Sequence, residues 1–273
     1  MRLSIRHTTH YSFEEPVVHA LQRLRLTPKA TQGQEVLEWE MNYSNARKEI
    51  EYEDQNYNTV TLVAVEPEAR EVTIECKGMI DTEDNAGVIG QHSGHLPLWS
   101  FVSQTPLTKP GAEVRRLVQS PAVGGTPTVD DLHALSQRIR DAVAYKTGQT
   151  GVTTTAEESM KQGSGVCQDH AHIFIGAARA MDIPARYVSG YLMMNDRIDQ
   201  EATHAWAEAH VQGLGWVGFD ISNGISPDPR YVRVATGRDY RDAAPITGIT
   251  FGTRNEDLRV EVSVEQQQVV QQQ

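Results

Sequence analysis

Apolar and polar residues alternate, in part, along the first third of the chain. One example is residues 2–6, Arg-Leu-Ser-Ile-Arg, and this period of two is typical of β-strands that bury one face. Proline and asparagine residues break the pattern at the spacing expected for turns between strands. The runs occupy residues 2–13, 20–27, 34–43, 46–52, 59–65 and 71–80. They predict an antiparallel, β-sandwich-like domain over residues 1–85.

The pattern changes after a polar, glycine-rich stretch at residues 81–98, which is typical of a linker. From about residue 97, apolar residues recur every three or four positions, as they do on one face of a helix. Helices are therefore predicted around residues 114–118 and 132–143, and Thr128 is a candidate N-cap for the second.

The third predicted helix carries the first candidate catalytic residue. Ser164 can cap this helix, and Cys167 lies at the start of one continuous apolar face. The other members of the face are Ala171, Phe174, Ile175, Ala178 and Met181. Pro184 ends the helix, and residues 185–192 are predicted as the strand that follows. Cys167 is thus expected in the first turn of a buried helix.

Two further strands are predicted at residues 203–211 and 215–222, joined by a tight turn. If the turn has three residues, Asp220 lies opposite Trp206 and diagonal to His204 on the same face, within reach of a hydrogen bond. A turn of four residues would put the aspartate and the histidine on opposite faces. The sequence permits the first register without requiring it.

One more alternating run, residues 258–264, precedes a tail rich in glutamine. We expect this run to form the last strand of a second domain, residues 86–265, and the tail, residues 266–273, to be disordered. The fold class expected from the whole pattern is α+β.

Composition narrows the range of partners and locations. The chain has 25 basic and 36 acidic residues, a net charge of −11 and a pI near 5.4, which argues against binding to nucleic acid or to anionic membranes. No stretch has the apolar length of a signal peptide core or a membrane span. Two cysteines make no disulfide framework, and a free thiol fits a reducing compartment. We therefore expect a cytoplasmic protein.

Three residues from separate predicted elements have the chemistry of a cysteine-based catalytic triad. At the first turn of a helix, the dipole and the free amide groups favour a thiolate, the nucleophilic form of cysteine. In the register above, Asp220 orients His204, which takes a proton from Cys167 and returns it to a leaving amine. Each residue alone also has a structural interpretation. Cys167 fits a small buried hydrophobe, His204 a histidine bonded to backbone, and Asp220 a turn residue.

Four sequence blocks around these residues are similar to a known family. They are Gly165-Val-Cys-Gln-Asp, Pro184-Ala-Arg-Tyr-Val-Ser-Gly-Tyr, Thr203-His-Ala-Trp-Ala-Glu and Gly215-Trp-Val-Gly-Phe-Asp. Together with residues 231–240 they resemble the transglutaminase-like core of bacterial proteins, a papain-related cysteine fold with helices packed on an antiparallel sheet. The N-terminal half resembles the β domain that often precedes this core.

The resemblance implies roles for the three residues: Cys167 as nucleophile, His204 as general base and acid, and Asp220 as orienting carboxylate. It implies attack on a carboxamide or peptide bond of a peptide or protein through a thioester. Hydrolysis, deamidation or transfer to a primary amine would follow. No cofactor is expected. The alternative is a catalytically silent member of the family that keeps the fold as a binding module.

Residues close to the triad are candidates for the substrate cleft. Trp206 and Trp216 flank the expected site, but two tryptophans on a sheet fit core packing equally well. Gln168 and His170 follow Cys167 directly. His170 is a departure from the family that the sequence resembles, in which an aromatic or apolar residue is common here, and it fits either the rim of the cleft or simple packing.

Two other groups of side chains have a structural interpretation that we favour. His170 and His172 lie two residues apart on a helix and point in different directions, so no metal site is expected. Arg186 and Arg233 are expected to form ion pairs rather than to bind substrate carboxylates.

Overall fold

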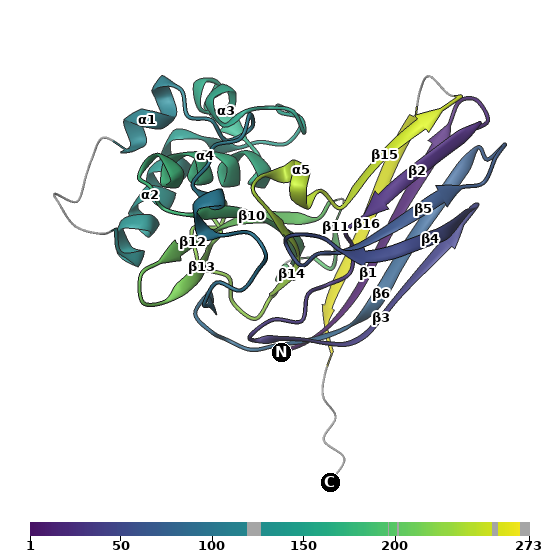
Figure 1. The fold of residues 1–273 in the computed structure, drawn as a ribbon, viewed down its shortest axis with the longest axis horizontal. Coiled ribbons are helices and arrows are strands. Elements are labelled where there is room, and N and C mark those ends of the chain that lie inside the picture. Colours follow the sequence, from purple (N-terminus) through teal and green to yellow (C-terminus); the bar gives the residue numbers. More distant parts are fainter. Residues whose placement is uncertain (119–126, 196, 201, 253–255, 268–273) are drawn as a thin grey trace, which may run out of the picture.

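The computed structural model describes residues 1–118, 127–195, 197–200, 202–252 and 256–267. It shows a strand-rich part built from both ends of the chain and a second part in which helices cover a sheet (Figure 1). The fold class is α+β, as expected. No helix that the structure describes is long and apolar enough to span a membrane.

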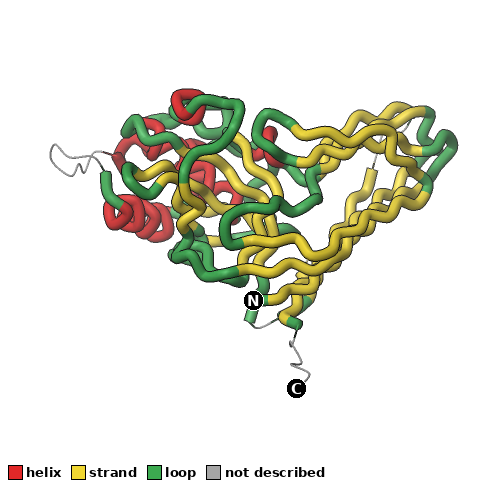
Figure 2. The backbone as a smooth tube through the Cα atoms, turned by 60° about the horizontal axis from the view of Figure 1, so that its bottom comes forward, coloured by secondary structure: helices red, strands yellow, loops and turns green. Residues whose placement is uncertain are grey.

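Two antiparallel sheets make up the strand-rich part and face each other (Figure 2). The predicted runs form β1 (Arg2–Phe13), β2 (His19–Leu24), β3 (Gln34–Ser44), β4 (Ala46–Glu53), β5 (Thr59–Val65) and β6 (Glu71–Thr82). One sheet contains β1, β3 and β6, the other β2, β4 and β5, and Tyr11, Val63 and Ile74 pack between them. Every second residue of β1 is buried, which confirms the period of two.

The last strand belongs to this part and not to the second domain, so that expectation is wrong. Strand β16 (Glu256–Gln266) pairs antiparallel with β1 along almost its whole length. Val262 and Val264 pack with Leu3 and Ile5, which are buried in the same cluster. Alternation predicted a strand with one buried face, but it carries no information on which sheet would cover that face. Most of the expected disordered tail, residues 268–273, lies outside the described residues.

A further strand was not predicted. Strand β15 (Ile246–Phe251) pairs antiparallel with β2 and is an edge of its sheet. The two-residue strand β11 (Asp199–Gln200) pairs with β16 and so connects the second part to the strand-rich part.

The second part is a five-stranded antiparallel sheet in the order β14-β10-β12-β13-β7. Its strands are β7 (Val88–Gly90), β10 (Ala185–Leu192), β12 (His204–Val211), β13 (Gly215–Phe219) and β14 (Tyr231–Gly237). The helices are η1 (Leu98–Phe101), α1 (Ala112–Val118), α2 (Val129–Ala142), α3 (Ala156–Gln162), α4 (Cys167–Ala180) and α5 (Tyr240–Ala243). The predicted helices are confirmed, including the Thr128 cap of α2. The helices that were not predicted are short.

Helix α4 is the centre of this part and packs against α1, α2, α3 and β12. Small side chains of β12, those of Ala205, Ala207 and Ala209, lie in the same buried cluster and let the helix approach the sheet closely. Ser164 does not cap the helix, because it lies in the two-residue strand β9 (Ser164–Gly165). The carboxylate of Asp169 instead accepts a hydrogen bond from the Val166 N–H at 2.8 Å.

The β12–β13 hairpin has the register that puts His204 and Asp220 on one face. Val211 pairs with Gly215, so the turn has three residues, which is the first of the two turn lengths that the sequence left open. Gly213 and Gly215 have positive φ angles of 86° and 85°, a conformation that glycine adopts without steric cost. Two glycines thus permit the short turn on which the site geometry depends.

A buried ion triad lies where the sheet meets the strand-rich part. Glu208 has no solvent exposure and accepts hydrogen bonds from Arg186 Nε at 2.6 Å and Arg233 Nε at 2.7 Å, so both arginines form ion pairs as expected. The side-chain amide of Gln34 on β3 binds the backbone N–H and C=O of Arg233 at 2.7 and 2.8 Å. Burial alone would raise the pKa of Glu208, but the two guanidinium groups lower it to about 2.

Glu208→Gln should destabilise the protein, because it leaves two buried guanidinium groups without their counter-charge. The free energy of unfolding at pH 7, measured by urea titration, should fall by about 3–5 kcal/mol. The folded-state pKa of Glu208 lies below its usual value. The stability that Glu208 adds relative to glutamine is therefore fully present above pH 4.5 and is lost as the pH falls through about 2. The exposed control Glu53→Gln should change stability by less than about 0.5 kcal/mol. Equal stability of the two variants at pH 7 would contradict this account.

Candidate active site

Cys167 is the first residue of α4, as the apolar pattern predicts. Helix α3 ends at Gly163, and β9 then pairs in parallel with β8 (Ala144–Tyr145), which holds the chain just before the cysteine. The side chain of Cys167 is half-buried and lines a cavity, whereas Cys76 is fully buried in the strand-rich part. The two thiols therefore differ in their access to reagents.

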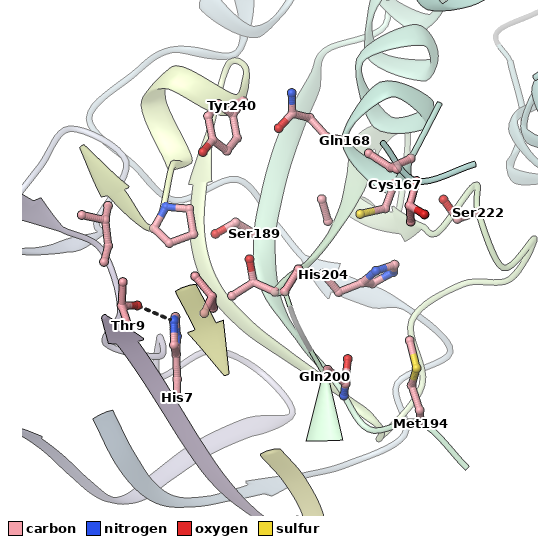
Figure 3. A pocket seen from close by; sticks show the side chains of 18 of the residues that line it. His7, Thr9, Cys167, Gln168, Ser189, Met194, Gln200, His204, Ser222 and Tyr240 are labelled. Carbon is pink, nitrogen blue, oxygen red and sulfur yellow. Dashed lines mark hydrogen bonds between the residues drawn. The ribbon is translucent and has the colours of Figure 1, made fainter. Parts of the chain in front are cut away.

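His204 lies between Cys167 and Asp220, and Figure 3 shows its ring close to the cysteine sulfur. Its Nε2 lies 2.6 Å from Oδ2 of Asp220, which leaves Nδ1 for the hydrogen bond with the thiol. Burial alone lowers the pKa of His204, but the hydrogen bonds with Asp220 and Cys167 outweigh it and raise the pKa to about 10. The imidazole is therefore protonated at neutral pH.

Asp220 is fully buried and is bonded on both oxygens. Besides His204, its Oδ2 accepts hydrogen bonds from Tyr231 Oη and Asn223 Nδ2, each at 2.7 Å, and its Oδ1 accepts one from Asn223 N at 3.1 Å. Burial alone would raise the pKa of Asp220, but these donors lower it below its usual value. The carboxylate stays charged and holds the imidazole in one orientation.

Cys167 and His204 line a cavity of about 870 Å³, a size typical of ligand sites. From the second part it is also lined by Tyr145, Gln168, Ser189, Ser222 and Tyr240. From the strand-rich part it is lined by His7, Thr9, Tyr11, Leu258 and Val260. Figure 3 shows His7 and Thr9 across the pocket from Cys167. The cavity thus lies between the two parts of the molecule.

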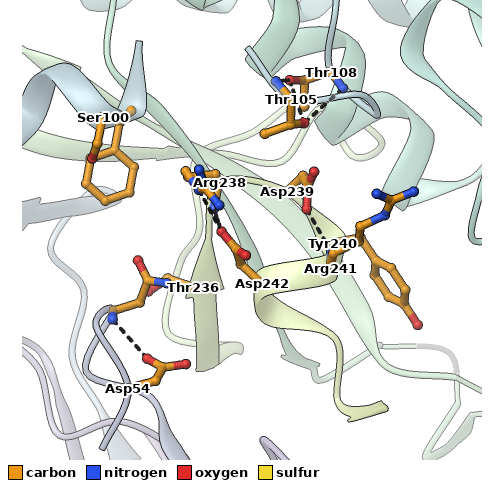
Figure 4. A network of polar contacts seen from close by, with 12 residues as sticks. Asp54, Ser100, Thr105, Thr108, Thr236, Arg238, Asp239, Tyr240, Arg241 and Asp242 are labelled. Atoms are coloured by element: carbon orange, nitrogen blue, oxygen red, sulfur yellow. Dashed lines mark hydrogen bonds and ion pairs between the residues drawn. The ribbon is translucent and has the colours of Figure 1, made fainter. Parts of the chain in front are cut away.

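Tyr240 lines this cavity and begins the short helix α5. Figure 4 shows the polar contacts around it. The carboxylate of Asp239 accepts a hydrogen bond from Arg241 N at 2.8 Å at the start of α5, and Arg238 pairs with Asp242 at 2.9 Å. The backbone N–H of Tyr240 donates to Nε2 of His172 on α4 at 3.1 Å. The helix that carries Cys167 therefore also fixes this tyrosine.

Of the proposed cleft residues, Gln168 lines the cavity and His170 does not. His170 is buried, and its two ring nitrogens bond to Ser222 Oγ at 2.8 Å and to Val143 O at 2.9 Å. It packs behind the site, so its assignment to the cleft is corrected. In the part of the chain that the structure describes, no three His, Cys, Asp or Glu side chains gather as metal ligands would.

The two tryptophans are also buried and do not line the cavity. Trp206 stacks beside His204 with ring centroids 6.2 Å apart, and so supports the imidazole from behind. Trp216 packs edge-on against Phe101, and the guanidinium of Arg186 lies 3.9 Å from its ring centroid. Their assignment to the cleft is corrected, because closeness along a strand does not tell which side chains face the substrate.

Three residues of the site were not singled out from the sequence. Asn223 lies in the turn after β13, and a polar side chain three residues after a buried aspartate is the signal that could have found it. Tyr231 arrives from β14, and no local pattern relates it to Asp220. Tyr145 lines the cavity beside Cys167, and its pKa is raised to about 12 by burial and by the charge of the cysteine.

Two family models match the sequence. Residues 115–221 match the transglutaminase-like superfamily, and residues 3–81 match the bacterial transglutaminase-like N-terminal region. The first range contains the three residues of the site, and the second contains the N-terminal strands β1–β6 almost completely. Residues 115–221 are thus similar to a transglutaminase-like core, and residues 3–81 to the N-terminal region of bacterial transglutaminase-like proteins.

Similar proteins extend over nearly the full length. An uncharacterized protein of Mycobacterium leprae is 29% identical over 276 residues, which covers 96% of this chain and 98% of that protein. One of Mycobacterium tuberculosis is 29% identical over 292 residues, covering 97% and 92%. A crystal structure described as "a Putative Cysteine Protease from Cytophaga hutchinsonii" is 21% identical, with a TM-score of 0.76 over 99% of this chain and 92% of that one. It shares the fold.

Cys167 should react with iodoacetamide at least tenfold faster than Cys76 at pH 7. Burial raises the pKa of Cys76 to about 12, whereas Cys167 is half-buried at a cavity and its side chain is hydrogen-bonded to His204, which can take up the thiol proton. His204→Ala should slow labelling of Cys167 about tenfold, and the exposed control His19→Ala should not. Mass spectrometry of the two cysteine peptides over time measures both rates. Equal, slow labelling of the cysteines would argue against the site.

Asp220→Asn should lower the pKa of His204 from about 10 towards its usual 6.5, because the charge that stabilises the imidazolium is lost. NMR titration of the imidazole signals measures this shift, with His204→Ala used to assign the resonance. Asp141→Asn, at an exposed position on α2, is the matched control and should leave the titration unchanged. A His204 pKa that stays near 10 in Asp220→Asn would mean that a group other than Asp220 stabilises the protonated imidazole.

Proposed function

We propose that this chain is a cysteine-dependent enzyme that attacks carboxamide or peptide bonds. The observation that carries the proposal is the hydrogen-bonded series Cys167–His204–Asp220 with the thiol at a cavity. In it, Cys167 is the nucleophile, His204 the acid and base, and Asp220 the group that orients the imidazole.

The first half of the proposed reaction forms a thioester. The sulfur of Cys167 attacks the carbonyl carbon, and the carbonyl oxygen becomes an oxyanion near the start of α4, where the Cys167 N–H is one of the free amides of the first turn. The proton on His204 passes to the leaving nitrogen, so that ammonia or an amine departs and the acyl group remains on sulfur.

The second half releases the acyl group. Water or a primary amine attacks the thioester carbonyl, and His204, now neutral, takes the proton from the attacking atom. The sulfur leaves and regains its starting state. Water gives hydrolysis or deamidation, and an amine gives a new amide. All steps use groups of the protein, so a cofactor is not part of the proposal.

The family and the fold support an acyl-transfer reaction of this type. The superfamily is named for transglutaminases, and the Cytophaga hutchinsonii structure that shares the fold is described as a putative cysteine protease. We propose a peptide or protein as the substrate, with a primary amine as a possible acceptor and without nucleic acid or membrane as partners. A reducing compartment such as the cytoplasm would keep the Cys167 thiol free.

Incubation with a library of glutamine-containing peptides should produce an acyl-enzyme that adds the peptide mass, less ammonia or an amine, to Cys167. Intact-mass and peptide mass spectrometry after acid quenching detect it. Cys167→Ala should abolish the adduct without lowering the melting temperature, because the side chain is only half-buried.

The same incubation with an added primary amine separates the two outcomes. An amide product with the amine indicates transamidation, and a carboxylate product alone indicates hydrolysis or deamidation. Absence of any acyl-enzyme, together with peptide binding that Cys167→Ala leaves unchanged, would favour the silent binding module.

A further inference from the structure

Strands β1 and β16 form one wall of the cavity that contains Cys167. Tyr11 pairs with Leu258 and Thr9 with Val260. Directly paired residues of antiparallel strands project on the same face of the sheet. All four side chains line the cavity, so the wall is a face of the N-terminal sheet and is not built by the second part of the molecule.

The wall is largely apolar. Pro245 and Ile246, where the chain enters β15, also line the cavity and extend the surface made by Tyr11, Leu258 and Val260. Among the described residues that line the cavity, the charged side chains outside the Cys167–His204 pair are Arg197 and Asp199, on the connection between β10 and β12. A charged group placed against the wall itself would therefore have no partner on it.

Leu258 is 52% exposed although it faces the cavity. Binding of an apolar group to such an exposed apolar surface is favourable, because it removes both surfaces from water. The wall thus contains a large aliphatic side chain whose surface is available to a ligand and is not used in the core of the protein.

The wall is continuous with the side of the cavity that carries the triad. Tyr11 of the wall and Tyr240 of the second part both line this one cavity, together with Cys167 and His204. Tyr240 comes from α5 and is bonded to α4 through His172. Figure 3 shows Tyr240 on the Gln168 side of the pocket and Thr9 on the opposite side.

We propose that this wall is a binding subsite for an uncharged, apolar side chain of the acyl donor, next to the carbonyl that Cys167 attacks. The N-terminal domain then takes part in substrate selection and is more than a support for the fold. This inference rests on the proposed function, since it assigns the substrate side of the same cavity.

Peptidyl chloromethyl ketones test the subsite without knowledge of the natural substrate. The sulfur of Cys167 displaces chloride from these reagents, and the side chain next to the ketone can be leucine, aspartate or lysine. The wild-type protein should react at least tenfold faster with the leucine reagent than with the aspartate reagent. Iodoacetamide, which has no side chain, reports the reactivity of the thiol alone.

Leu258→Asp should lower the rate with the leucine reagent about tenfold and raise the rate with the lysine reagent, because it replaces apolar surface with a negative charge. Its rate with iodoacetamide should stay within twofold of wild type. Ile249→Asp is the matched control: it lies on β15, is 64% exposed and does not line the cavity, so none of the three rates should change.

Three results would overturn the subsite. If Leu258→Asp keeps the wild-type preference for the leucine reagent while iodoacetamide labels Cys167 rapidly, the wall does not bind the side chain. The proposed function is then unaffected. If Leu258→Asp slows all reagents equally, including iodoacetamide, its effect is structural. If iodoacetamide labels Cys167 no faster than Cys76 in the wild-type protein, the proposed function fails together with the subsite.

Discussion

The geometry of the site depends on a carboxylate that has no contact with solvent. The donors to Asp220 come from three segments: His204 from β12, Tyr231 from β14 and Asn223 from the turn after β13. A buried charge without partners costs several kcal/mol, so the contacts of these segments with Asp220 contribute to the stability of the fold. The same requirement that stabilises the fold therefore orients the imidazole beside Cys167. Orientation of the His204 imidazole and stability of the sheet therefore both depend on the contacts of Asp220.

Much of the local structure could be predicted because it depends on side chains that are close in sequence. The N-terminal strands and the start of α4 at Cys167 follow from the spacing of apolar residues. The glycines at 213 and 215 indicate a tight turn, but the sequence left its length open between three and four residues. The candidate triad could be assembled from these parts, since a correct hairpin register already puts His204 and Asp220 on one face.

The rest depends on contacts between distant segments, and local patterns do not encode them. The alternation in β16 is the same whichever sheet receives it, so its place beside β1 could not be predicted. The prediction that Trp206 and Trp216 line the cleft failed for a related reason. They are near the triad in sequence, but their side chains are buried. The wall opposite Cys167 comes instead from strands at the two ends of the chain. The short helices α3 and α5 owe their positions to caps and packing rather than to a long apolar face.

The pairing of β16 with β1 also sets an order of events during synthesis. Domains generally fold as the chain emerges, with N-terminal segments first. Here β1 emerges first, but β16, which pairs with one of its edges, emerges only after the whole helical part has been made. Until then one edge of β1 has no partner and the cavity lacks Leu258 and Val260. A nascent chain can therefore bring Cys167, His204 and Asp220 together before it has a closed cleft, because Leu258 and Val260 of the surface facing the thiol are made only afterwards.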